Sequence, residues 1–238
     1  MPMDGRHDEG YSPLFSQLRM VSDLCRGFLR EEWIDWLDLD TLERRDVTAA
    51  GSLIWRLRWQ GGSTWVYLLL EPRQEEDPAM ALRVGYHREL LYQDLLRHRE
   101  TAPPARLPLA LPVVLYYGAA PWRAPREALE LLLPLPAALQ RHAPRTRYLL
   151  LDAARDPIPA NAGADNLVSL LCELERSRTP EAVDALLERL VSLISSPGDE
   201  ALRQAWSAFL GGSFLPRRFP HLFSPATLET GDAGGVLA

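Results

Sequence analysis

The sequence contains no lysine, and all 26 of its basic residues are arginine. Arginine remains protonated in proteins, so these side chains cannot act as general bases. The abundance of alanine, leucine and proline in the same chain favours a GC-rich coding bias over a functional choice of arginine. The formal net charge of −6 argues against a protein that coats nucleic acid without specificity, but it leaves room for a local basic groove.

Cysteine and histidine are too few and too scattered to form metal or nucleophile motifs. Cys25 and Cys172 each lie in an apolar helical pattern and are expected in the core, so neither a disulfide framework nor a metal cluster is indicated. The sequence also lacks a Gly-x-Ser-x-Gly context and a glycine-rich phosphate loop. Without paired ligand spacing, the histidines are expected to be surface or capping residues: His7, His87, His98, His142 and His221.

Long apolar runs are absent as well. Prolines interrupt the longest apolar stretches before they reach the length needed to span a bilayer, which is about 18 to 20 apolar residues. The first residues, MPMDGRHDEGYSP, show no positively charged segment followed by an apolar one, so no secretory signal is expected. The sequence therefore predicts a cytoplasmic protein without a membrane partner.

The stretch that organises the chain is SLIWRLRWQGGSTWVYLLLEPR, Ser52 to Arg73. Leu53 to Trp59 alternates apolar and polar residues, which is typical of a half-buried strand with arginine on its second face. Trp65 to Leu70 is apolar on both faces and should be central in a sheet. A Gly-Gly turn between them predicts an antiparallel hairpin.

The second strand ends in Glu71-Pro72-Arg73, and alternation places Glu71 and Arg73 on one face. A carboxylate beside a cation at the end of a buried strand is a candidate site. The alternative is an ordinary ion pair at a strand end, since such ends are often charged.

The rest of the chain predicts an α/β fold followed by helices. A helix from Ser12 to Leu29 comes first, then a turn with a short extended piece over Glu31 to Leu42, and a weakly indicated strand over Arg44 to Ala50. After the hairpin, a helix over Ala79 to Arg99 and a strand over Leu111 to Gly118 predict a parallel crossover. Arg147 to Asp152 should add one more strand.

Beyond Asp152 only helices are expected. They should begin at Asp165, at Thr179-Pro180 and near Asp199, and the stretch from Gly211 onward should be irregular. The resulting division is a domain over residues 1–152, a helical section over 153–215 packed on it, and an irregular tail over 216–238.

Several stretches together resemble the recombination-promoting nuclease family, also called YhgA-like transposases. The strongest is LPVVLYYGAAPW at Leu111 to Trp122, and the similarity covers residues 7 to 220. The other stretches are HDEGYSPLFS, LIWRLRW, VYLLLE, MALRVGY, RYLLLD and NLVSLLCELE.

That family is assigned to the PD-(D/E)XK nucleases, so the resemblance implies a mixed sheet flanked by helices, DNA as partner and Mg²⁺-dependent phosphodiester cleavage. Carboxylates would hold the ion, which activates water and offsets phosphate charge. A homodimer is left open. A second function remains beside cleavage: a non-catalytic DNA- or protein-binding module that keeps the fold.

The family pattern of an Asp before the first strand and Glu-x-Gln after the second falls on Ser52, Glu71 and Arg73. The resemblance therefore implies Ser52, Glu71 and Arg73 as the catalytic set, Glu71 as the metal ligand, and Arg56, Arg58 and Arg73 as DNA contacts. Ser52 brings no negative charge for a hard cation, and Arg73 places a positive charge beside it, so Mg²⁺ binding should be weak or lost. Asp46 and Asp8 are the alternative carboxylates, without supporting spacing.

Overall fold

The protein is built on one five-stranded sheet with strand order β1-β2-β3-β4-β5. The computed structural model describes residues 10–29, 32–45, 52–59, 64–98 and 106–220. The sheet is mixed, because β1, β2 and β3 pair antiparallel whereas β3, β4 and β5 pair parallel. Its strands are β1 (Leu37–Arg45), β2 (Leu53–Trp59), β3 (Trp65–Arg73), β4 (Leu109–Tyr116) and β5 (Leu149–Asp152).

The predicted hairpin is confirmed. β2 and β3 pair antiparallel with Leu53 opposite Leu70 and Arg58 opposite Trp65, and β3 is the middle strand of the sheet. Residues 66 to 72 of β3 are all buried, as the apolar run predicts. The Gly-Gly turn itself lies outside the described residues.

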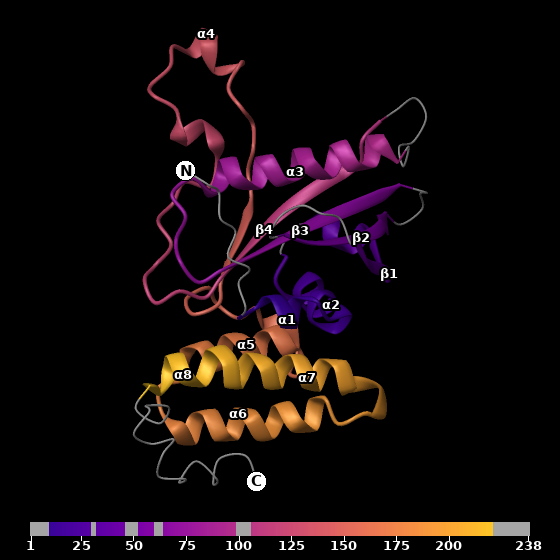
Figure 1. Cartoon of the computed structure of the whole chain (residues 1–238), viewed down its shortest axis with the longest axis vertical. Helices are drawn as coiled ribbons and strands as arrows, with labels where there is room; N and C mark the ends of the chain where they lie inside the picture. Colours follow the sequence, from indigo (N-terminus) through magenta and orange to yellow (C-terminus); the bar gives the residue numbers. More distant parts are fainter. Residues whose placement is uncertain (1–9, 30–31, 46–51, 60–63, 99–105, 221–238) are drawn as a thin grey trace.

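The crossover between β3 and β4 is also confirmed. α3 (Met80–Arg97) follows β3, and β4 returns beside β3 in parallel. The buried stripe of α3 includes Met80, Val84, Leu91 and Leu95, which pack on Tyr67 and Leu69 of β3 and on Ala110 and Val114 of β4. This helix covers one face of the sheet (Figure 1).

The N-terminal segment differs from the prediction of a single helix. It forms α1 (Ser12–Phe15) and α2 (Leu18–Gly27), because the Ser16 hydroxyl donates to the Ser12 carbonyl at 2.7 Å and Gln17 is extended. The next segment forms a 3₁₀ turn, η1 (Glu32–Trp36), and then β1. β1 therefore begins earlier than the weakly indicated strand over Arg44 to Ala50, whose later part lies outside the described residues.

The C-terminal section is helical, as predicted. Its main helices are α5 (Leu167–Arg176), α6 (Pro180–Leu193) and α7 (Glu200–Phe209). Thr179 caps α6 as expected, but the cap of α5 is Asn166 and not Asp165, because the Asn166 side chain accepts from the Val168 and Ser169 amides. The same side chain donates to the Asp23 carbonyl at 2.9 Å, which ties α5 to α2.

The prediction of an irregular stretch from Gly211 onward is wrong for residues 211–218, which are helical. Leu210–Phe214 forms a π-helical turn, η5, and Leu215–Arg218 forms α8, because Phe214 and Leu215 are buried in the core. Residues 221–238 lie outside the described residues. Shorter turns complete the chain: η2 (Ala128–Leu131), α4 (Ala137–Gln140), η3 (Ala160–Ala162) and η4 (Pro197–Asp199).

The molecule is layered in the order α3, sheet, N-terminal helices and C-terminal helices (Figure 1). α5 packs against α2 and α7 against α1, so the two N-terminal helices lie between much of the C-terminal section and the sheet. One hydrophobic core joins these layers on the face of the sheet that carries Trp55, Leu57 and Leu68, and it contains both Cys25 and Cys172, as expected. Among the described residues, no helix has the length and apolar character needed to cross a membrane.

Candidate functional site

The hairpin brings Ser52 and Glu71 together under α3. The register that pairs Leu53 with Leu70 places Ser52 beside Glu71 on the neighbouring strand. The Ser52 hydroxyl donates a hydrogen bond to Glu71 Oε1. The hairpin predicted from the sequence therefore brings these two strand ends together.

Arg73 closes the other side of the Glu71 carboxylate. Its Nη2 donates to Glu71 Oε2 at 3.0 Å, and its Nη1 donates to the Pro72 carbonyl at 3.2 Å. Alternation along β3 places both side chains on the face that α3 covers. Glu71 has no exposed side-chain surface, while the Arg73 side chain is 15% exposed.

The fourth member of this group is His87, which was predicted from the sequence to be a surface or capping residue and was not identified as a site residue. His87 is buried, and its Nδ1 lies 2.5 Å from Glu71 Oε1 and 2.8 Å from Ser52 Oγ. The available signal was its position in α3: His87 falls between Val84 and Leu91 on the buried stripe, three residues after one and four before the other. Ser52, Glu71, Arg73 and His87 are called the Glu71 cluster below.

The arrangement of the Glu71 cluster does not suit nucleophilic catalysis by serine. In a serine, histidine and carboxylate triad, the two ring nitrogens face different partners, one the hydroxyl and the other the carboxylate. Here Ser52 and Glu71 both contact the same nitrogen, Nδ1 of His87. The imidazole therefore cannot pass a proton from serine across its ring towards the carboxylate.

The cluster also does not fit Mg²⁺. This ion prefers octahedral oxygen ligands, usually carboxylates and waters. The cluster offers one carboxylate whose Oε2 is bonded to a guanidinium and whose Oε1 is bonded to Ser52 and His87. Across the described residues, no group of three or more His, Cys, Asp or Glu side chains is arranged to hold a metal ion. Asp46 and Asp8 lie outside those residues.

The other two predicted DNA contacts lie apart from the cluster. Arg56 and Arg58 are four and six residues along β2 from Ser52, or about 13 to 20 Å at the rise of a strand. Both guanidinium groups stack on Trp65, at 4.3 and 4.9 Å from its ring centre, and Arg56 Nε is 2.5 Å from Glu43 Oε1. Of the three arginines named from the sequence, the structure brings only Arg73 to Glu71.

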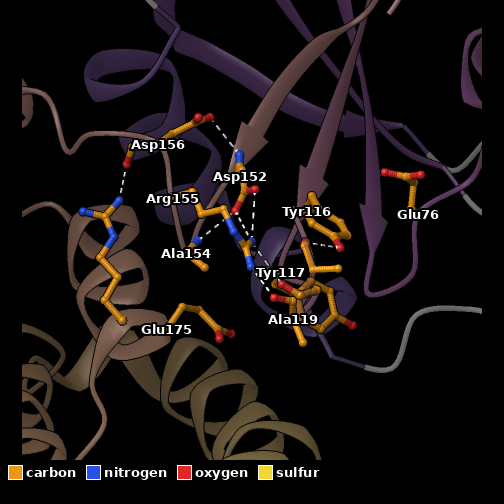
Figure 2. A network of polar contacts seen from close by, with 12 residues as sticks. Glu76, Tyr116, Tyr117, Ala119, Asp152, Ala154, Arg155, Asp156 and Glu175 are labelled. Atoms are coloured by element: carbon orange, nitrogen blue, oxygen red, sulfur yellow. Dashed lines mark hydrogen bonds and ion pairs between the residues drawn. The ribbon is translucent and has the colours of Figure 1, made fainter. Parts of the chain in front are cut away.

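A second polar network lies at the ends of β4 and β5, and it has a bracing role (Figure 2). Arg155 Nη1 donates to Asp152 Oδ1 at 3.2 Å and to the Gly118 carbonyl at 3.3 Å, and Nη2 donates to the Ala119 carbonyl. Burial raises the pKa of Asp152, while the adjacent Arg155 lowers it. Asp156 accepts from Arg176 through its carbonyl, so this network links the sheet to α5.

Comparison with known proteins places the chain in one family. The chain matches the family model described as "Putative transposase, YhgA-like" over residues 5–201. It is 24% identical over 127 residues to the recombination-promoting nuclease RpnD of Escherichia coli O157:H7, covering 47% of this chain and 48% of that protein. The chain thus spans about half the length of this curated relative. No solved structure matches. Because the family model covers most of the sequence, the chain belongs to the YhgA-like transposase family.

Proposed function

We propose that this chain is a DNA-binding member of its family that retains the nuclease fold without metal-dependent cleavage. The observation that carries this proposal is the closure of Glu71: Arg73 occupies one carboxylate oxygen, and Ser52 with His87 occupies the other. A cation would have to displace Arg73 from Glu71 and would then have only one protein carboxylate as a ligand. The attraction between Arg73 and Glu71 opposes the displacement, and the repulsion between the guanidinium and the cation opposes binding.

The residues of the cluster therefore hold the site together and perform no chemical step. Glu71 joins β2, β3 and α3 through its bonds to Ser52, Arg73 and His87. Buried polar groups that are fully hydrogen-bonded fix the relative position of the elements that carry them. In this proposal, the position once suited to a metal has become a structural link between the hairpin and α3.

DNA as the ligand is supported by the family and by the name of the relative, a recombination-promoting nuclease. Arg58 is exposed at the far end of β2 beside Trp65, where a guanidinium could reach a phosphate. A protein-binding module is the alternative, and the net charge of −6 is the observation that favours it.

A single binding and cleavage assay tests the proposal. Labelled duplex DNA is incubated with the purified chain in EDTA or in Mg²⁺, and bound and cleaved species are measured in parallel. We expect salt-sensitive binding in both conditions and intact DNA in both. Metal-dependent cleavage that Glu71→Gln abolishes would refute the loss of catalysis. Absence of binding to both single- and double-stranded DNA would favour the protein-binding module.

A further inference from the structure

The connection from β4 to β5 is much longer than the topology needs. Parallel neighbouring strands require a crossover of about a dozen residues, whereas this connection runs from Tyr117 to Tyr148. It leaves the body of the molecule beside α3 as an extended arm that carries η2 and α4 (Figure 1). Long connections without a full helix or strand in a compact domain are commonly functional. Residues 119–148 are called the arm below.

The arm is basic although the chain as a whole is acidic. It contains five arginines and two glutamates, whereas the whole chain has a net charge of −6. Both glutamates are engaged: Glu130 accepts from the Glu127 amide at 3.1 Å, and Glu127 lies 3.6 Å from Arg147. The five arginines are all exposed: Arg123, Arg126, Arg141, Arg145 and Arg147.

Three of these arginines line one groove. A cavity of about 590 Å³ in the arm is bordered by Arg141, Arg145 and Arg147, with Gln140 and Glu127 beside them. The Arg147 side chain is 75% exposed, so its long contact with Glu127 is a weak surface pair. Within the described part of the chain, Arg141 and Arg145 form no ion pair. Among the described residues, Arg141 and Arg145 therefore present guanidinium groups that no carboxylate neutralises, while Glu127 offsets part of the charge of Arg147.

Thr146, which lines the groove, contacts α3, the helix that carries His87 of the Glu71 cluster. Thr146 Oγ1 lies 3.4 Å from Arg88 Nη2 of α3, and the arm passes so close to Gly85 that a Cβ there would approach Thr146 Oγ1 to 3.0 Å. Gly85 and Arg88 flank His87 in the same turn. A ligand in the groove thus lies on the side of the sheet that α3 covers.

We propose that the groove formed by Arg141, Arg145 and Arg147 binds the phosphate groups of a nucleic-acid backbone. Planar guanidinium groups match phosphate oxygens through paired hydrogen bonds, which distinguishes them from simple positive charges. Leu133 of the arm, at 85% exposure, lies outside the lining of the groove, whereas Leu129 contributes an apolar side chain to that lining. The choice of DNA as the source of phosphate rests on the proposed function, while the groove itself requires only phosphate chemistry.

The test compares Arg141→Ala/Arg145→Ala with a charge-matched control, Arg26→Ala/Arg178→Ala, whose arginines are exposed elsewhere. Binding of the full chain to labelled duplex DNA is measured over a range of salt concentrations. Each contacted phosphate contributes about 0.9 to the slope of log affinity against log salt. The arm variant should therefore lose about 1.8 from the slope and bind at least tenfold more weakly at low salt, whereas the control should match the native chain.

A lysine variant, Arg141→Lys/Arg145→Lys, separates charge from geometry. It should retain most of the salt slope but bind more weakly than the native chain, because lysine keeps the charge and loses the planar fork. Thermal unfolding of every variant should match the native chain, since the substituted side chains are exposed. If Arg141→Ala/Arg145→Ala binds DNA with unchanged affinity and unchanged salt slope, the groove does not bind the DNA backbone. That result would contradict the inference and would leave the proposed function unaffected.

Inorganic tripolyphosphate distinguishes the remaining outcomes. If the native chain binds tripolyphosphate through Arg141 and Arg145 but does not bind DNA, the groove is supported and the proposed function fails. If the native chain binds neither tripolyphosphate nor DNA, both the phosphate-binding groove and the proposed function are wrong. If Leu133→Ser abolishes self-association in light scattering while the arginine variants leave DNA binding intact, the arm is a protein contact and the inference is wrong.

Discussion

Glu71→Gln is the substitution that most clearly separates a structural cluster from a metal site awaiting its ion. The change preserves the size of the side chain and removes its charge. Glutamine can still accept from Ser52, but it loses the charge-assisted hydrogen bonds to Arg73 at 3.0 Å and to His87 at 2.5 Å. We expect the folded state to be markedly destabilised.

The magnitude follows from the burial of the partners. Removing one member of a buried ion pair costs about 3 to 5 kcal/mol, because the other charge is left uncompensated. The Arg73 side chain is 15% exposed and can regain part of its hydration, so the lower end, about 3 kcal/mol, applies. In a chain of this size, that loss lowers the Tm by about 6 to 12 °C.

Thermal and urea unfolding followed by tryptophan fluorescence measure this change. The matched control is Glu89→Gln on α3, where the Glu89 side chain is 59% exposed and its carboxylate lies 3.4 Å from Arg88 Nη2. Its effect should be within about 0.5 kcal/mol. A Glu71→Gln chain as stable as the native one, or more stable, would refute the closed cluster, because removing a ligand carboxylate from a site built for function is commonly neutral or stabilising.

Three further predictions address the metal site, the helix caps and the core. Ser52→Asp combined with Arg73→Gln should tighten Mg²⁺ binding in isothermal titration and raise DNA cleavage above the native level; a folded variant that gains neither would show that the divergence extends beyond these positions. Asn166→Ala should cost about 1 to 2 kcal/mol in urea unfolding, because two amides at the start of α5 lose their acceptor, and an unchanged midpoint would contradict the cap. Burial raises the pKa of Cys25 and of Cys172 to about 12, so both thiols should resist a thiol reagent at pH 8 until the chain is unfolded. Since their folded pKa values exceed the unfolded ones, stability should fall as the pH rises from about 9 towards 12, and replacing both cysteines by alanine should reduce that fall.

The sheet and α3 could be predicted from sequence because their signals are local and strong. The alternation in β2, the apolar run in β3 and the glycines between them specify a hairpin, and a helix followed by an apolar strand specifies the crossover. The predictions for β1 and α8 were incomplete or wrong for physical reasons. β1 is charged and gains its strand structure from pairing with β2, while α8 is short and depends on the burial of Phe214 and Leu215.

The candidate site was predictable only in part. Pairing across the hairpin places Ser52 beside Glu71, and alternation places Arg73 on the same face as Glu71, so these three follow from strand pairing and periodicity. His87 comes from a helix and needs the tertiary contact between α3 and the sheet. Its position on the apolar stripe of α3 was a usable signal, because a histidine in such a stripe needs a buried polar partner, and Glu71 is the buried carboxylate beneath it.

Isothermal titration of Mg²⁺ into the native chain tests the central claim most directly, since the claim is that Arg73, Ser52 and His87 have closed the Glu71 carboxylate to a cation. Titration of Glu71→Gln under the same conditions provides the reference. The closed cluster predicts that neither protein has a site tighter than the millimolar range and that the two titrations coincide. A tight, stoichiometric Mg²⁺ site in the native chain that disappears in Glu71→Gln would contradict it.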